Sequence, residues 1–372
     1  MPAPTEQLSS RRPLVLLSRL LLPRENTTAG SGLAAAPGLV PAIGRITHDE
    51  FEQLLKVANA NHVLVRGLEV FLRLMRDSRD AIRAGWAEAA LAAEHARIKN
   101  AVACLHEVCA GLGAEGCDVT VIKSLDHWPD LGSDLDLYTN ASWASVVRVM
   151  KERFQAQVAP RSWGDRLAGK WNFQLPILPE AIEIHIGHLG QTGEQEAIAA
   201  HLPERSRGVV LAGLEFRVPS TPDRLMLSTL QRVYRHFYFR LCDIADTTAL
   251  AEAGEIDYQE VRRLSDAAGI WEGVATYLMV VSDFLKRYRG SGLTLPAFVS
   301  ASARFGGGEI YIGGGFLRVP IIPQSASLYG TQLAGLLKRR ELQNSARLGL
   351  LPWLATAAAV TQIITGSDKG VW

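Results

Sequence analysis

The sequence is poor in cysteine and almost without net charge, and each shortage excludes a class of protein. Four cysteines occur in 372 residues, with no CxxC pair and no zinc-finger spacing to histidine. A disulfide-stapled secreted scaffold is therefore excluded, and a reducing, cytoplasmic protein is expected. Thirty-nine Lys and Arg against 38 Asp and Glu leave a formal net charge of +1. The chain as a whole has no electrostatic pull toward nucleic acid or an anionic membrane, so any polyanion site must be local.

Long apolar runs are also scarce. Near the N-terminus, Arg19 interrupts the apolar stretch 14–22 before it reaches signal-peptide length, so no export signal is expected. Residues 348–367 carry no charge and follow the basic residues 338–340, a pattern that resembles a membrane span with a basic flank. Pro352 and several polar residues weaken that interpretation. We expect a buried or half-buried C-terminal helix there, with membrane contact as the alternative.

The composition is that of an ordinary globular protein, with 48% apolar and 21% charged residues. A length of 372 residues predicts two or three compact units. Hydrophobic periodicity changes along the chain from helical to strand-like and back to helical. We therefore expect an α+β protein, in which a small mixed β-sheet is flanked by N-terminal and C-terminal helical regions. The expected divisions are a flexible arm over 1–45, a helical region over 46–115, a sheet domain over 116–218, a helical domain over 219–290, and a loop-rich segment with a C-terminal helix over 291–372.

Local patterns place elements within these divisions. Strands are expected over 119–122, 135–138, 171–175 and 181–187. The Pro-rich run 219–223 predicts the end of the preceding strand and the start of a helix. The chain over 224–289 is then expected to be helical. Two glycine triplets at 306–308 and 313–315 lack the spacing of a phosphate loop, so they predict a mobile hairpin instead.

Two acidic residues alternate with two leucines at 134–137. Successive strand side chains point to opposite faces, so Asp134 and Asp136 share one face while Leu135 and Leu137 point to the core. Like charges at that distance repel, and one carboxylate would take up a proton unless a cation lies between them. Carboxylate oxygens suit Mg²⁺. The pattern therefore predicts a divalent-cation site, with a solvated strand edge as the alternative.

A second alternating strand, residues 181–187, places Glu183 and His185 on one face. Glu183 is the expected third acid, although a half-exposed strand often carries one acid without a function. Three carboxylates on adjacent strands could hold two ions ~3.5–4 Å apart, the arrangement used in phosphoryl chemistry. His185 is expected to be a structural hydrogen-bond partner of Glu183.

Three segments carry a resemblance to a known family. They are Ile122-Lys123-Ser124, Gly132-Ser133-Asp134-Leu135-Asp136-Leu137, and Glu183-Ile184-His185. Their order and spacing resemble the polymerase-beta-type nucleotidyltransferase superfamily, and within it the bacterial branch described as nucleotidyltransferase family proteins. The likeness extends over about residues 46–290 and includes His236, Arg240-Leu241 and Asp243.

The resemblance implies a small mixed-sheet nucleotidyltransferase core that moves a nucleoside monophosphate from an NTP, with ATP expected, and releases pyrophosphate. It implies Asp134, Asp136 and Glu183 as catalytic residues and as ligands of Mg²⁺ or Mn²⁺. The nucleotide-binding residues implied are Lys123, Ser124, Gly132, Ser133 and Arg240.

Lys123 departs from the family pattern, because the superfamily usually has Gly-Gly or Gly-Ser at the position of Lys123-Ser124. Pro129 and Gly132 leave room for only a short turn of helix before the acid pair. A lysine here could contact the β- or γ-phosphate as a point charge, with Ser124 as a hydroxyl donor. The alternative for Lys123 is a surface charge at a strand end.

Two basic clusters are further candidates. They are Arg232, Arg235, His236 and Arg240, and Arg161, Arg166 and Lys170 interleaved with Trp163 and Trp171. The first is expected near one face of a helix, where it would face either a triphosphate or solvent. The second is expected to be a solvated loop, with a triphosphate or base contact as the alternative.

The leading hypothesis is therefore a nucleotidyltransferase with an unidentified acceptor, for which a small molecule is favoured and a membrane partner is not expected. One alternative is a toxin-like enzyme that modifies RNA, which would need an extended basic face. Another is a non-catalytic scaffold that retained the fold, because a fold alone does not establish an activity.

Overall fold

The computed structural model of the protein describes residues 4–22, 38–189, 198–350 and 353. Its first elements are the helices α1 (Pro4–Leu21), α2 (Leu39–Ile43), α3 (His48–Ala60), α4 (Leu64–Asp77) and α5 (Ala81–Ala114). A capping box fixes the start of α3, because the Thr47 hydroxyl accepts from the Glu50 N–H and the Glu50 carboxylate accepts from the Thr47 N–H. Helices α3 to α5 lie where the periodicity predicts helices.

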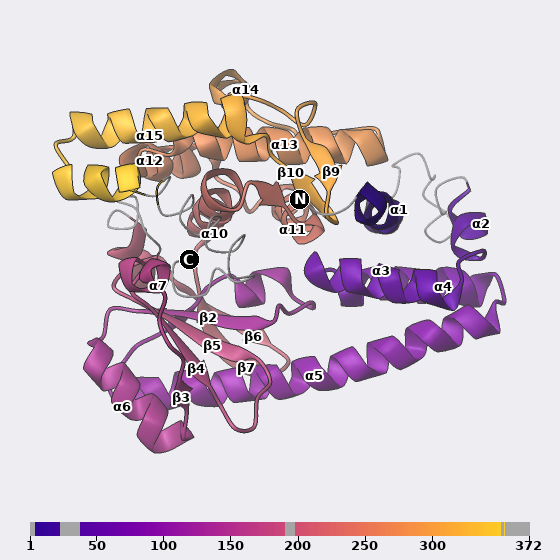
Figure 1. The fold of residues 1–372 in the computed structure, drawn as a ribbon, viewed down its shortest axis with the longest axis horizontal. Helices are drawn as coiled ribbons and strands as arrows, with labels where there is room; N and C mark the ends of the chain where they lie inside the picture. Colours follow the sequence, from indigo (N-terminus) through magenta and orange to yellow (C-terminus); the bar gives the residue numbers. More distant parts are fainter. Residues whose placement is uncertain (1–3, 23–37, 190–197, 351–352, 354–372) are drawn as a thin grey trace.

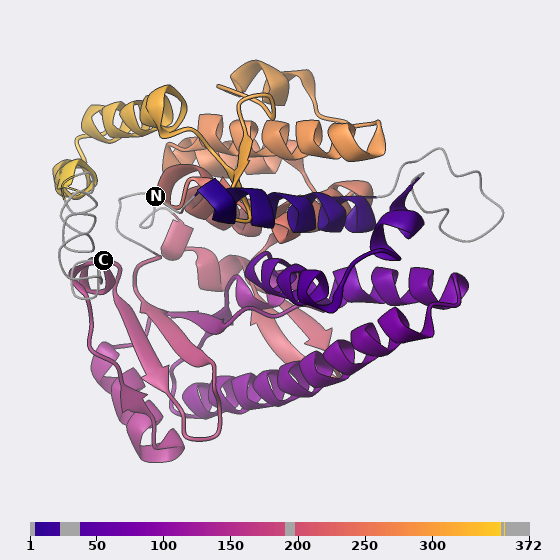
Figure 2. The same cartoon turned by 45° about the vertical axis from the view of Figure 1, so that its right-hand side comes forward.

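Helix α1 differs from the expectation of a flexible arm over 1–45. Leu14, Leu17 and Leu20 are at most 2% exposed, and α1 contacts α3 and α4. Leucines three residues apart share one side of a helix, and that side is buried here. Figure 2 shows α1 lying between the α3–α4 pair and the C-terminal helices. The Gly- and Ser-rich residues 27–32, which favoured an arm, lie outside the described residues.

The central sheet has five strands. They are β1 (Thr120–Val121), β2 (Asp134–Thr139), β3 (Gln157–Val158), β4 (Lys170–Gln174) and β5 (Ala181–Ile186). Their order is β1-β2-β5-β4-β3, in which β2 and β5 run parallel and all other neighbours are antiparallel. The expected α+β class with a small mixed sheet is therefore confirmed. Figure 1 shows α5 and α6 (Trp143–Phe154) on one side of this sheet and the layer that contains α10 to α15 on the other.

The chain after the sheet is not one run of helix. It passes through α9 (Leu202–Arg205), the ribbon β6 (Arg207–Leu211) and β7 (Leu214–Val218), α10 (Thr221–Thr229), the π-helical turn η2 (Leu230–Arg235), β8 (Tyr238–Phe239), α11 (Leu241–Glu252), α12 (Tyr258–Ala268) and α13 (Trp271–Arg289). Ser220 caps α10, as the stop-and-start pattern predicts. In η2 the His236 N–H donates to the Gln231 carbonyl five residues earlier, at 2.8 Å, and the helix ends there. The expectation of helix throughout 224–289 is therefore wrong at this break.

A glycine hairpin completes the layer beside β8. Strands β9 (Tyr311–Gly313) and β10 (Phe316–Arg318) are joined by Gly314 and Gly315, whose φ values of +59° and +78° suit a two-residue turn. The hairpin expected from the glycine triplets is thus confirmed, and β10 also pairs with β8. The remaining elements are η1 (Ser124–His127), α7 (Trp163–Leu167), α14 (Ala297–Ser302), η3 (Ile321–Ser325), α15 (Ala326–Lys338) and helical residues 342–350.

Buried apolar side chains from α1 to α15 form one continuous core. Within the described ranges, no helix is both long enough and apolar enough to cross a membrane. Residues 351–352 and 354–367 of the uncharged C-terminal stretch lie outside those ranges.

Candidate functional site

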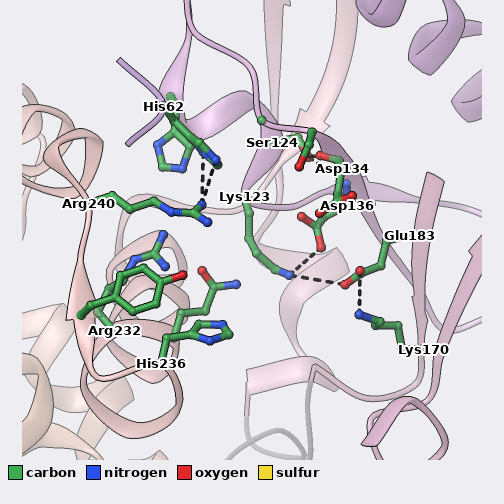
Figure 3. A pocket seen from close by; sticks show the side chains of 15 residues that line it. His62, Lys123, Ser124, Asp134, Asp136, Lys170, Glu183, Arg232, His236 and Arg240 are labelled. Carbon is green, nitrogen blue, oxygen red and sulfur yellow. Dashed lines mark hydrogen bonds and ion pairs between the residues drawn. The ribbon is translucent and has the colours of Figure 1, made fainter. Parts of the chain in front are cut away.

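A cavity of about 260 Å³ lies between the central sheet and the chain from η2 to α11. Figure 3 shows its two walls. The acidic wall consists of Asp134, Asp136 and Glu183, from β2 and β5. The basic wall consists of His62, Arg232, His236 and Arg240, from the end of α3, from η2 and from the start of α11. Groups of opposite charge therefore face each other across one pocket.

The register of β2 and β5 builds the acidic wall. Asp136 lies directly opposite Glu183, and the side chains of both are 13% exposed. His185 Nε2 lies 2.9 Å from Glu183 Oε1 and 3.5 Å from Asp136 Oδ1, in agreement with a hydrogen-bonding role. Ligand atoms of Asp136, Glu183 and His185 lie within 4.8 Å of one another, and Asp134, whose side chain is exposed, is not part of that group. The structure thus brings the acids of the two strands together.

Two lysines neutralise this wall. Lys123 Nζ lies 2.5 Å from Asp136 Oδ1 and 3.9 Å from Glu183 Oε1, and Lys170 Nζ lies 2.8 Å from Glu183 Oε2. The acid pair is expected to need a cation between its carboxylates. In this structure the ammonium group of Lys123 lies between Asp136 and Glu183. Lys123 is therefore not a surface charge at a strand end.

The acids differ in how readily they ionise. Burial opposes ionisation of Glu183, but the hydrogen bond from His185 and the charges of Lys123 and Lys170 outweigh it and hold the pKa of Glu183 well below its usual range. Although Asp134 is exposed as a residue, desolvation by the neighbouring pocket wall and the charges of Asp136 and Glu183 raise the pKa of its carboxyl. Glu183 is thus ionised, while Asp134 takes up a proton more easily.

Lys123 occupies a backbone conformation that suits glycine. Its φ and ψ are 61° and −53°, and the Ser124 N–H donates to the Ile122 carbonyl at 2.6 Å, which closes a tight γ-turn. The four-residue 3₁₀ turn η1 (Ser124–His127) follows, as short as Pro129 and Gly132 predict. A non-glycine residue at such a φ costs about 1–2 kcal/mol, so the position holds strain.

Ser124 has a different role from the one expected. Its hydroxyl accepts from the Asp136 N–H at 2.7 Å and donates to the Asp134 carbonyl at 3.2 Å, and the residue is 4% exposed. Because the hydroxyl proton is already engaged, Ser124 fixes the turn against β2 and has no free donor for a phosphate.

Gly132 and Ser133 line the cavity beside His62. A Cβ atom at Gly132 would lie 2.9 Å from His62 Cε1, so only glycine fits there without a shift of the imidazole. Ser133 is exposed. Gly132 therefore acts through close packing, whereas Ser133 is accessible to a ligand.

The basic wall depends on the break in the helix after α10. Arg232 is 3% exposed, and its Nε lies 2.7 Å from Asp243. Arg240 Nη1 lies 2.9 Å from His62 Nε2, and the buried Arg240 Nε has no hydrogen-bond partner among the described residues. His236 is exposed as a residue, but desolvation of its ring in the pocket and the charges of Arg232, Arg235 and Arg240 lower its pKa to about 3. Burial and Arg240 likewise lower the pKa of His62. Neutral imidazoles therefore alternate with permanently charged guanidinium groups.

Other sequence candidates lie elsewhere. Arg161 packs over the Trp171 ring at 4.3 Å, and Arg166 packs near Trp163 at 5.6 Å. Neither arginine is among the described residues that line the cavity. Arg235 is also absent from this lining, and its Nη1 donates to the Leu189 carbonyl at 3.2 Å.

Lys170, expected in a solvated loop, instead lies on β4 and reaches the acids. Sequence reasoning missed Lys170, His62 and His127 as pocket residues. The alternation of Lys170 and Asn172 with Trp171 was the one available signal, but the face that meets Glu183 depends on the pairing of β4 with β5.

The arrangement offers oxygen ligands for a hard divalent cation on one wall and guanidinium donors for a polyanion on the other. A metal-bound triphosphate carries both complementary charges. Comparison with models of known protein families and with curated proteins finds no match.

Proposed function

We propose that the protein is a metal-dependent nucleotidyltransferase, which moves a nucleoside monophosphate from an NTP, with ATP the expected donor, to an acceptor and releases pyrophosphate. The observation that carries the proposal is the pairing of Asp136 with Glu183 opposite the buried Arg232 and the half-buried Arg240. The resemblance to the polymerase-beta-type superfamily, with this mixed sheet as its nucleotidyltransferase core, is part of the same proposal.

The acidic wall fits the metal that such a reaction needs. Its donors are carboxylate oxygens, which Mg²⁺ and Mn²⁺ prefer, and Asp136 and Glu183, whose ligand atoms lie within 4.8 Å of each other, would hold the ion. When bound, the ion supplies charge neutralisation for the triphosphate and orients it. A strongly depressed pKa makes Glu183 a weak base, so we assign Glu183 to metal ligation. We assign to Asp134, whose pKa is raised, the role of the base that removes the proton from the acceptor substrate.

The remaining residues act by charge and position. Arg240, with its buried and unpartnered Nε, is the guanidinium best placed to pair with a triphosphate oxygen. When the nucleotide binds, Lys123 would leave Asp136 and pair with the terminal phosphate. The Asp136 carboxylate would then be free to bind the metal ion. Positioning and charge stabilisation then supply the rate, and little covalent work is asked of the chain.

The acceptor is proposed to be a small molecule. The cationic groups of the site line a cavity of about 260 Å³, and the formal net charge of the chain is only +1, which disfavours RNA as the partner. One observation favours the scaffold alternative. The ammonium of Lys123 pairs with Asp136, so this acid is neutralised without a metal ion.

Calorimetry with ATP and the other NTPs, with and without Mg²⁺, separates the enzyme from the scaffold. An enzyme should bind an NTP only with the metal, and labelled NTP should yield pyrophosphate and a labelled product by mass spectrometry of extracts. Arg240→Ala should weaken binding, while Lys151→Ala on the exposed side of α6 serves as the control. No metal-dependent binding of any NTP would rule out the transferase.

A further inference from the structure

We propose that His62, His127 and Cys242 form a zinc site at the base of the cavity, separate from the acidic wall. One ligand atom from each residue lies within 4.8 Å of the other two. His127 Nε2 lies 3.7 Å from Cys242 Sγ. A tetrahedral zinc holds a nitrogen and a sulfur ligand about 3.5–3.6 Å apart, so these two atoms already have nearly the separation required.

A carboxylate orients the central histidine. Asp246 Oδ2 lies 2.5 Å from His127 Nδ1, which directs the Nε2 lone pair toward Cys242. Arg66 fixes that carboxylate in turn, through contacts of 2.5 Å to Asp246 and 2.6 Å to Asp130. A carboxylate on the second nitrogen of a ligating histidine is the usual support of a zinc site.

Hydrogen bonds also hold the other two ligands in place. The Asn61 side chain accepts from the Leu241 N–H at 3.0 Å, and the Asn61 carbonyl accepts from the Cys242 N–H at 3.2 Å. These bonds join the end of α3, which carries His62, to the start of α11, which carries Cys242. Residues from three distant parts of the sequence are therefore brought together before any metal arrives.

The donor set selects the metal. Two imidazoles and one thiolate suit a borderline-soft ion such as Zn²⁺ and not Mg²⁺, which the carboxylates of the acidic wall suit. Among the described residues this group supplies three ligands, the number found in zinc sites that keep one position open. His62 and His127 line the cavity, so the open position would face it.

Arg240 is the feature that opposes a cation here, because its Nη1 lies 2.9 Å from His62 Nε2. Within the described ranges its Nε has no hydrogen-bond partner, so the guanidinium leaves one donor unbonded where it lies. Zinc should therefore displace Arg240 from His62, and Arg240→Ala should tighten zinc binding several-fold.

Metal analysis of the full-length, tag-free protein tests the site. The parent should carry about one zinc per chain, and Cys242→Ser and His127→Ala should lose it while Cys104→Ser, a buried cysteine on α5, keeps it. Circular dichroism checks that the variants fold. Zinc retained by folded Cys242→Ser, or an unchanged zinc affinity in Arg240→Ala, would overturn the proposal.

Cobalt provides a measurement that needs no variant. The metal-stripped parent, titrated with Co²⁺, should develop the intense visible bands of a tetrahedral ion and a thiolate-to-cobalt charge-transfer band. The weak spectrum of octahedral cobalt, without the thiolate band, would refute the site. The outcome does not depend on nucleotidyl transfer, because the acidic wall contains no thiolate.

Discussion

Replacing Lys123 separates its two effects on the protein, backbone strain and charge. Lys123→Ala and Lys123→Gly both remove the ammonium that lies 2.5 Å from Asp136, but only alanine keeps a Cβ atom at a φ of 61°. The left-handed conformation costs a non-glycine residue about 1–2 kcal/mol. Glycine loses about 0.5–1 kcal/mol more than alanine through the entropy of the unfolded chain. The glycine variant should therefore be more stable than the alanine variant by about 0.5–1 kcal/mol.

The sign of that difference is the decisive result. Urea unfolding of the two metal-free variants, with Lys151→Ala as the surface control, gives the free energies of unfolding directly. If the turn at residue 123 held no strain, alanine would be the more stable variant by about 0.5–1 kcal/mol. An alanine variant that is equal to or more stable than the glycine variant would refute the strain argument.

The charge effect is measured on the same two proteins. Loss of the ammonium from the acidic wall should raise the affinity for Mg²⁺ alone by about tenfold, or ~1.4 kcal/mol, because a competing cation is removed. The affinity for the NTP should fall in both variants, since the terminal phosphate loses a partner, with a smaller effect on the chemical step. Calorimetric titrations with Mg²⁺ and with NTP measure these opposite shifts. Reduced Mg²⁺ affinity in both variants would show that Lys123 does not compete for the acids.

Three further changes test other parts of the site. NTP binding should require Mg²⁺ or Mn²⁺, so an affinity unchanged by excess EDTA in calorimetry would refute the metal assignment. Asp136→Asn should abolish transfer and destabilise the metal-free protein by about 1–3 kcal/mol in urea unfolding, because Lys123 loses its closest partner. An unchanged free energy of unfolding would mean that this ion pair contributes nothing to stability. His236 has its pKa lowered from 6.5 to about 3, so it contributes stability above pH 6.5 that is lost as the pH falls from there toward 3. In His236→Gln the stability should depend less on pH over this range, because the unfolded chain takes up about one proton fewer. An identical pH profile of stability would contradict the lowered pKa of His236.

The acid strands were predictable because their signal is local. A period of two fixes which side chains share a face, whatever the rest of the fold does, so Asp134 and Asp136 could be assigned to one face from sequence alone. The glycine turn at 314–315 was predictable for the same reason, because positive φ at two successive residues favours glycine. The short turn after Lys123 followed from Pro129 and Gly132.

The residues that sequence reasoning missed depend on tertiary contacts. Lys170 reaches Glu183 only because β4 pairs antiparallel with β5 in one particular register. His62 precedes the acid pair by two helices, and it lies at the pocket because its neighbour Asn61 accepts hydrogen bonds from the backbone of Leu241 and Cys242 at the start of α11. The break at η2 arises from a bond between His236 and Gln231, which no propensity in this run of residues indicates. Such placements are properties of the assembled core rather than of any local window.

The charged groups of the two walls differ in how they are paired. Lys123 neutralises Asp136 and Arg232 pairs with Asp243, whereas Arg240 rests against the neutral ring of His62 and keeps its positive charge for an anionic ligand. In the proposed reaction, a triphosphate would give Lys123 an anionic partner in place of Asp136, and would give Arg240 one in place of the neutral His62. Asp136 would then be released for metal ligation when the donor nucleotide binds. A lysine in a strained turn, where glycine would fold more easily, is reasonable on these terms, because it couples release of the acids to occupancy of the pocket.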